Sequence, residues 1–89
     1  MRLDKYLKIS RIIKRRTVAN EAAGAGRISV NGKTAKPSSD VNVGDLIEIR
    51  FGSRSMTVRV DSISEYATKA GAAEMYTVIS ESGATKDAE

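Results

Sequence analysis

The dipeptide Asn31-Gly32 is the feature that most constrains how this chain folds. It follows a short segment, residues 28–30, in which apolar and polar side chains alternate. Asn-Gly after such a segment favours a tight turn with positive φ at both positions, and that turn joins antiparallel strands. The sequence therefore predicts a hairpin whose return strand is 33–36, closed by Pro37. We assign Asn31 and Gly32 to turn geometry rather than to contact with a ligand.

Three later segments have the same alternating pattern. Ile47, Ile49 and Phe51 fall on one face of the first, and the apolar residues of the second also alternate. Period-two alternation is typical of strands that bury one face. We therefore predict strands at 46–51, 56–60 and 75–79, separated by a loop at 38–45, a turn at 52–55 and a polar loop at 64–74.

The residues before the hairpin have the periodicity of short helices. At 100° per residue, Leu3, Tyr6 and Leu7 share one face of a helix over 2–10. Ile12 and Ile13 do not continue that stripe, so we expect them to turn inward in a short connection.

A second helix is predicted over 15–25. Its expected buried stripe contains small side chains, and its start has no strong N-cap, which leaves backbone N–H groups for water or for a phosphate. A left-handed residue is expected at Gly26, just after its end. The residues of the stripe are Val18, Ala19, Ala22 and Ala23.

The predicted fold class is α+β, with two short N-terminal helices packed on a small, mostly antiparallel sheet of four to five strands. A chain of 89 residues has room for one hydrophobic core. We divide it into a domain over 1–63, a loop and final strand of the same domain over 64–80, and a disordered acidic tail over 81–89.

Composition argues against an enzyme. The chain has no Cys and no His, so it lacks a thiol nucleophile, the commonest general base and the commonest metal ligands. Its carboxylates are scattered along the sequence, and neither GxGxxG nor GxxxxGK[ST] occurs. We predict no catalytic residues, no metal and no cofactor. No apolar run has the length of a membrane span and no signal peptide is evident, so we expect a cytoplasmic protein.

Positive charge is concentrated at the N-terminal end. Residues 1–16 hold seven of the 15 basic residues. Formal charge is +8 over residues 1–36, zero over 37–60 and −4 over 61–89. Charge that is segregated in this way, on a segment with its own apolar stripe, is typical of a folded surface that faces a polyanion.

Structured RNA is the polyanion that fits best. A membrane-binding helix usually exposes Trp or Phe on its apolar face, which here is needed for the core. The second helix has little beyond Asn20 to read DNA bases, and the few aromatic residues form no platform for stacking single strands. Recognition of RNA by shape and phosphate position remains.

Four segments resemble the S-four-type RNA-binding domain, also called the alpha-L motif: RLDK at 2–5, RRT at 15–17, GRISVNG at 26–32 and VGD at 43–45. Within that superfamily, RIIKRRT at 11–17 and AEMYTV at 73–78 are similar to the RqcP family of bacterial ribosome-associated quality-control factors. The similarity covers about residues 1–79. A related heat-shock protein of ribosome rescue shares the module but has a basic C-terminal extension, whereas this chain ends in acidic residues.

The resemblance implies a non-enzymatic, monomeric RNA-binding factor. Family members bind large-subunit rRNA and P-site peptidyl-tRNA on obstructed subunits and work with RqcH, which extends the stalled chain with alanine. The alternative is a general structured-RNA, tRNA or ribosome-rescue module outside that pathway. Carried over by position, the RNA-contacting residues would be Arg2, Lys5, Lys8, Arg11, Lys14, Arg15, Arg16 and Thr17.

Asp4 is the one acid within this basic segment. Our hypothesis is that it pairs with Arg11 or Arg16 and orients the guanidinium for RNA; the alternative is a contact with Lys8 or the helix dipole. Two lysines beside the hairpin, Lys33 and Lys36, extend the RNA surface or are solvated residues of a sheet edge.

Overall fold

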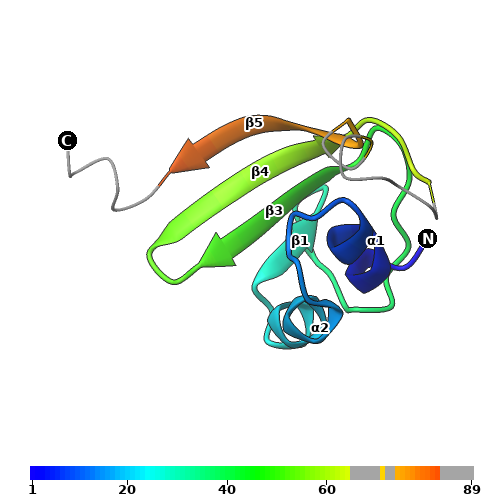
Figure 1. Ribbon diagram of the computed structural model, residues 1–89. Helices are drawn as coiled ribbons and strands as arrows, with labels where there is room; N and C mark the ends of the chain where they lie inside the picture. Colours follow the sequence, from blue (N-terminus) through cyan, green and yellow to red (C-terminus); the bar gives the residue numbers. More distant parts are fainter. Residues whose placement is uncertain (65–70, 72–73, 83–89) are drawn as a thin grey trace.

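The computed structural model describes residues 1–64, 71 and 74–82, and it has the predicted α+β class. Two helices precede five strands that form one antiparallel sheet in the order β2-β1-β3-β4-β5 (Figure 1). The elements are α1 (Leu3–Ile9), α2 (Arg16–Gly24), β1 (Ile28–Val30), β2 (Lys33–Thr34), β3 (Leu46–Phe51), β4 (Arg54–Val60) and β5 (Tyr76–Ser82).

The turn between β1 and β2 confirms the hairpin prediction. Asn31 and Gly32 have φ of 54° and 85°, the left-handed values that a tight Asn-Gly turn requires. The Asn31 side chain also accepts a hydrogen bond from the Leu46 N–H at 2.9 Å, which ties the turn to the start of β3. The return strand is shorter than predicted, because the Lys36 N–H donates to the Ser39 hydroxyl at 2.8 Å and leaves the ladder.

Helix α2 begins and ends as the sequence indicates. Its N-cap residue, Arg15, makes no side-chain capping bond. After the last turn, Gly26 has φ of 79° and donates its N–H to the Ala23 carbonyl at 3.1 Å, a Schellman-type ending. The prediction that Val18 is buried was wrong. The buried stripe centres on Ala19 and Ala23, and Val18 is turned away from it and 45% exposed.

A single hydrophobic core joins the helices to one face of the sheet. Leu3, Tyr6 and Leu7 of α1 are fully buried, as predicted, and pack in one cluster with the inward residues of β1, β3 and β4. Ile13 is buried and Ile12 partly buried, which confirms that their connection turns inward. The sheet residues of the cluster are Ile28, Ile47, Ile49, Val58 and Val60.

The far ends of β3, β4 and β5 extend beyond the helices (Figure 1). Phe51 shares the face of Ile47 and Ile49 but is 42% exposed, because it stands at the β3–β4 hairpin, where no helix covers the sheet. The shared face is therefore confirmed, but of these three residues only Ile47 and Ile49 are buried. Strand β4 starts two residues earlier than predicted, at Arg54.

Strand β5 starts one residue later than predicted and continues to Ser82. A bulge opposite the Thr57–Val58 step lengthens it, since Val78 pairs with Val58 and Ser80 with Thr57, leaving Ile79 between them. The first two residues of the predicted disordered tail, 81 and 82, therefore belong to β5. Its remainder, 83–89, and most of the predicted 64–74 loop lie outside the described residues.

Helix α1 is tied to the start of β5 by a buried hydrogen bond. The Tyr6 hydroxyl donates to the Met75 carbonyl at 2.8 Å. Burial, the negative charge of Asp61 and the neighbouring Tyr76 all raise the pKa of Tyr6, so its hydroxyl stays a donor. This bond joins residues 69 positions apart.

We expect Tyr6→Phe to lower the free energy of unfolding by about 1–2 kcal/mol, because the buried Met75 carbonyl loses its donor. Urea unfolding followed by circular dichroism measures the change. Tyr76→Phe is the matched control, since the Tyr76 hydroxyl makes no hydrogen bond to the described residues. Equal unfolding midpoints for wild type and Tyr6→Phe would contradict the expectation.

Candidate nucleic-acid interface

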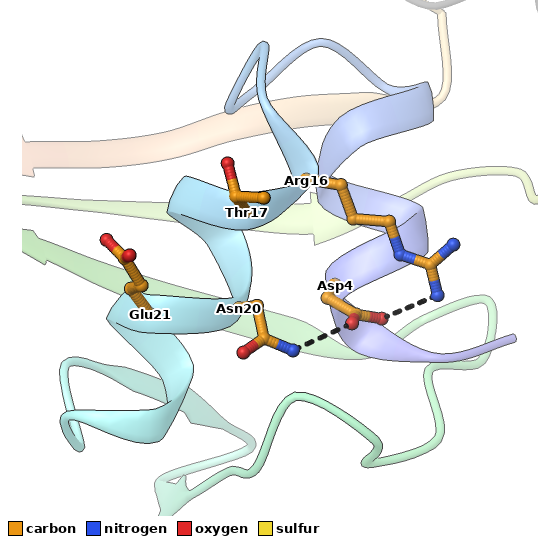
Figure 2. Close-up of a pocket in the computed structure, with 5 residues that line it drawn as sticks. All are labelled: Asp4, Arg16, Thr17, Asn20 and Glu21. Carbon is orange, nitrogen blue, oxygen red and sulfur yellow. Dashed lines mark hydrogen bonds and ion pairs between the residues drawn. The ribbon is translucent and has the colours of Figure 1, made fainter.

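The buried carboxylate of Asp4 lies at the centre of the candidate site. Its side chain, in the first turn of α1, is 2% exposed. Arg2 donates to it through Nε at 3.2 Å and Nη2 at 3.3 Å, and Arg16 through Nη2 at 3.5 Å. Asn20 donates through Nδ2 at 3.3 Å (Figure 2). One carboxylate therefore holds side chains from the N-terminal segment and from α2.

Local structure brings these groups together. The extended Arg2 precedes α1, whose first N–H groups are bound by the 37–39 loop: Leu3 donates to the Ser39 carbonyl at 2.8 Å. Arg16 opens α2, and Asn20 follows four residues later, so both side chains lie on one face of that helix. Packing of α1 against α2 then places this face over Asp4 (Figure 2).

The contacts keep Asp4 ionised. Burial alone would raise the pKa of its carboxyl group, but the Asn20 hydrogen bond, the charge of Arg16 and the contact with Arg2 outweigh burial and lower that pKa. Arg2 and Arg16 remain about half exposed, at 52% and 47% of their side chains. The site therefore presents two guanidinium groups to solvent, each oriented by a buried anion.

A cavity of about 320 Å³ lies beside this cluster. Figure 2 shows Arg16, Thr17, Asn20 and Glu21 on α2, with Arg16 and Asn20 reaching the Asp4 carboxylate from two sides. Its lining combines a guanidinium, a hydroxyl, an amide and carboxylates, which can donate and accept hydrogen bonds. The cavity can hold part of a polar ligand beside the two arginines.

The pairing hypothesis for Asp4 was right for Arg16 and wrong for Arg11. Arg11 follows the end of α1 with φ of 63°, and its side chain makes no contact with Asp4. The alternative contact with Lys8 is also absent from the hydrogen bonds and ion pairs of the described residues. Asp4 does lie in the first turn, where the helix dipole favours a carboxylate.

The other predicted residues lie on the helices, in their connection and beside the β1–β2 hairpin. Thr17 lines the cavity with Arg16. Lys5 is half-buried, Lys33 lies in β2, and Lys36 precedes the 37–39 loop that binds the first N–H groups of α1. Their contact with RNA stays a prediction. The exposed basic residues on and between the helices are Lys8, Arg11, Lys14 and Arg15.

Sequence reasoning missed the role of Asn20. It was considered only as a reader of DNA bases, yet its amide binds the Asp4 carboxylate. The spacing of four residues between Arg16 and Asn20 could have predicted this contact, because it places both side chains on one face of a helix. Glu21, which lines the cavity, was also not anticipated.

The described residues contain neither a metal-binding cluster nor a membrane-spanning helix. Residues 1–64, 71 and 74–82 contain no group of three or more acidic, His or Cys residues placed to hold a metal ion. Over the same residues, every helix is too short or too polar to cross a membrane.

Comparison with known proteins agrees with the resemblance seen in the sequence. The model of the S4 domain matches residues 1–47. The RQC P-site tRNA stabilizing factor of Listeria monocytogenes is 58% identical over 81 residues, which cover 91% of this chain and 88% of the relative. The protein of the same name from Bacillus subtilis is 54% identical over 81 residues, covering 91% and 94%.

A solved structure shares the fold. The heat shock protein 15 of Vibrio cholerae, described as trimeric, superposes with a TM-score of 0.79 at 33% identity, covering 88% of this chain and 80% of that one. The family match spans α1, α2 and the β1–β2 hairpin, which include the Asp4 cluster. This chain therefore belongs to the S4-domain proteins and, among them, to the family of RQC P-site tRNA stabilizing factors.

Proposed function

We propose that this chain is a non-enzymatic factor of bacterial ribosome-associated quality control. It binds large-subunit rRNA and P-site peptidyl-tRNA on stalled subunits and thereby supports RqcH-dependent alanine tailing of the obstructed nascent chain. The observation that carries the proposal is the buried Asp4 carboxylate, which orients Arg2 and Arg16 on an exposed surface. The P-site tRNA is inferred from the names of the Listeria and Bacillus relatives.

Oriented guanidinium groups suit RNA phosphates. Arginine presents a planar set of donors that binds a phosphate at two points or stacks on an unpaired base. Because Asp4 already holds Arg2 and Arg16 in place, less side-chain entropy is lost on binding. The two groups therefore act as fixed points that set the position of the protein on RNA.

The surrounding basic residues add attraction that does not need fixed geometry. Lysines act as point charges, and exposed arginines adapt to nearby phosphates. Arg11 has φ of 63°, the left-handed conformation that is common just after the end of a helix, and its exposed side chain belongs to this group of cations. We include in this surface Arg2, Lys5, Lys8, Arg11, Lys14, Arg15, Arg16 and Thr17, with Lys33 and Lys36 at its margin.

Purification of a tagged chain tests the proposal. Co-purification of free large subunits that carry tRNA and RqcH would support the proposed function. Loss of alanine tailing in cells that lack the chain would show that the chain supports this reaction. Treatment of the purified particle with ribonuclease separates direct contact with RqcH from contact through RNA. The same purification reports whether the chain is bound as one copy, as we propose.

A second candidate function is a general structured-RNA or ribosome-rescue module. The similarity to the Vibrio heat shock protein 15 favours it, because the two chains share the fold at 33% identity. Whole ribosomes or free tRNA in the purification, without stalled large subunits, would favour this second function.

We expect binding to weaken steeply with salt. If about six phosphates are neutralised, the logarithm of the association constant falls against the logarithm of salt concentration with a slope of roughly −4 to −5. Sedimentation with purified large subunits over 50 to about 300 mM potassium chloride measures the slope. A flat dependence would contradict an electrostatic interface.

A further inference from the structure

The sheet face opposite the helices carries a row of cations, and the proposed interface includes only one of them, Lys36, at its margin. Ile28 and Ile49 pair across β1 and β3 and point into the core, so the next pair, Arg27 and Arg50, points to the opposite face. The pairing is direct, because the Arg50 N–H donates to the Arg27 carbonyl at 3.0 Å.

Lys36 extends this row on the other side of Arg27. The Ala35 N–H donates to the Ile28 carbonyl at 2.9 Å, and the exposed Lys36 follows this buried residue, where the chain leaves the ladder next to Arg27. Neighbouring strands lie about 4.8 Å apart, so the backbones of Arg27 and Arg50 are direct neighbours. We call Lys36, Arg27 and Arg50 the back-face row.

The back-face row gives the fold no visible benefit. All three side chains are exposed, and none forms an ion pair with the residues that the structure describes. Like charges directly opposite each other on a sheet destabilise it, and Arg27 stands opposite Arg50. A bound anion would remove that repulsion.

Hydroxyl groups lie beside the back-face row. Two residues along the strands, the register aligns Thr34, Ser29, Glu48 and Thr57 across the same face. Glu48 is the one acid in this part of the face; the Arg59 and Asp61 pair, joined at 2.8 Å, lies further along β4. In this part of the face, the described residues therefore combine the three cations with several hydroxyl groups and a single carboxylate.

This chemistry fits the backbone of structured RNA. Arg and Lys side chains bind phosphates, and Ser and Thr hydroxyls bind phosphate oxygens or 2′-hydroxyls. The aligned positions contain no aromatic side chain on which a base could stack. We propose that the back-face row binds the phosphate backbone of a second RNA segment, so that the protein is held between two RNA surfaces. This inference rests on the proposed function for the first surface.

The double variant Arg27→Ala/Arg50→Ala tests the proposal on purified large subunits carrying P-site tRNA. We expect affinity to fall about tenfold and the salt slope to become shallower by about 1.5, because two phosphate contacts are lost. The matched control is Arg54→Ala/Arg59→Ala, which removes the same charge from the hairpin and from a side chain already paired with Asp61.

Equal affinity losses in the two double variants would overturn the proposal and leave only a general effect of charge. A wild-type affinity and a wild-type salt slope for Arg27→Ala/Arg50→Ala would also overturn the proposal. If Arg16→Ala abolishes binding in the same assay while the back-face variant binds normally, the second surface fails and the proposed function stands. If Arg16→Ala also binds normally, the proposed function fails. Circular dichroism checks that each variant is folded.

Two further measurements locate the contact. Glu48→Gln removes the carboxylate from this face, and we expect binding to become about two- to threefold tighter. A benzophenone side chain placed at Thr57 should cross-link to RNA on illumination, and sequencing of the adduct distinguishes rRNA from tRNA. Weaker binding of Glu48→Gln, or cross-links to protein alone, would overturn the proposal.

Discussion

Arg16→Ala is expected to abolish association with large ribosomal subunits and to leave the fold intact. Arg16 has two properties that no other cation of the described residues combines. Asp4 holds its guanidinium group, and its side chain lines the cavity beside Thr17. Loss of an oriented, charged donor removes both the charge and the geometry of the contact. The fold should survive because Asp4 keeps its hydrogen bonds from Arg2 and Asn20.

The stability cost should be below about 1 kcal/mol, because Arg16 is half exposed and solvent screens its ion pair. Co-sedimentation with large subunits measures binding, and circular dichroism with urea unfolding measures the fold. Arg54→Ala is the control, since it removes the same charge from the distant β3–β4 hairpin. Arg16→Lys keeps the charge without the planar fork, and we expect it to bind weakly. Normal association of folded Arg16→Ala would contradict the assignment.

Local sequence chemistry was sufficient to predict most of the fold. Asn31-Gly32 and Gly26 occupy the positive φ values that their residue types favour. The spacing of Leu3, Tyr6 and Leu7 identified the buried side of α1. Periodicity did not specify how far the buried face extends, because Phe51 shares the face of Ile47 and Ile49 but lies at the hairpin that no helix covers.

The candidate site was predictable only in part. Charge and resemblance pointed to Asp4 and Arg16, which lie 12 positions apart and meet because α1 packs against α2. The contact of Arg2 with Asp4 has no periodic signal, since Arg2 is extended and lies outside the helix. The pairing of Arg27 with Arg50 depends on strand register, which the sequence does not specify at that position.

Asp4→Asn separates orientation from charge, because the two effects have opposite signs. The substitution makes the chain more positive, which alone would strengthen binding to RNA. It also weakens the contacts that hold Arg2 and Arg16, which should weaken binding. We expect orientation to dominate, with about a tenfold loss of affinity. Glu81→Gln adds the same charge at an exposed position on β5 and should bind at least as tightly as wild type.

The same variant has a predicted effect on stability. The folded protein lowers the pKa of Asp4, so its ionised form contributes stability that is complete above the unfolded pKa of about 3.9 and lost as pH falls through the lower folded value. At neutral pH, Asp4→Asn should cost about 1–3 kcal/mol, because a buried charged acceptor is replaced by a neutral amide. Urea unfolding at pH 7 and pH 3 should show the gap between wild type and variant narrowing at the lower pH. A gap independent of pH, with unchanged RNA affinity, would mean that Asp4 neither anchors the two helices electrostatically nor orients the arginines.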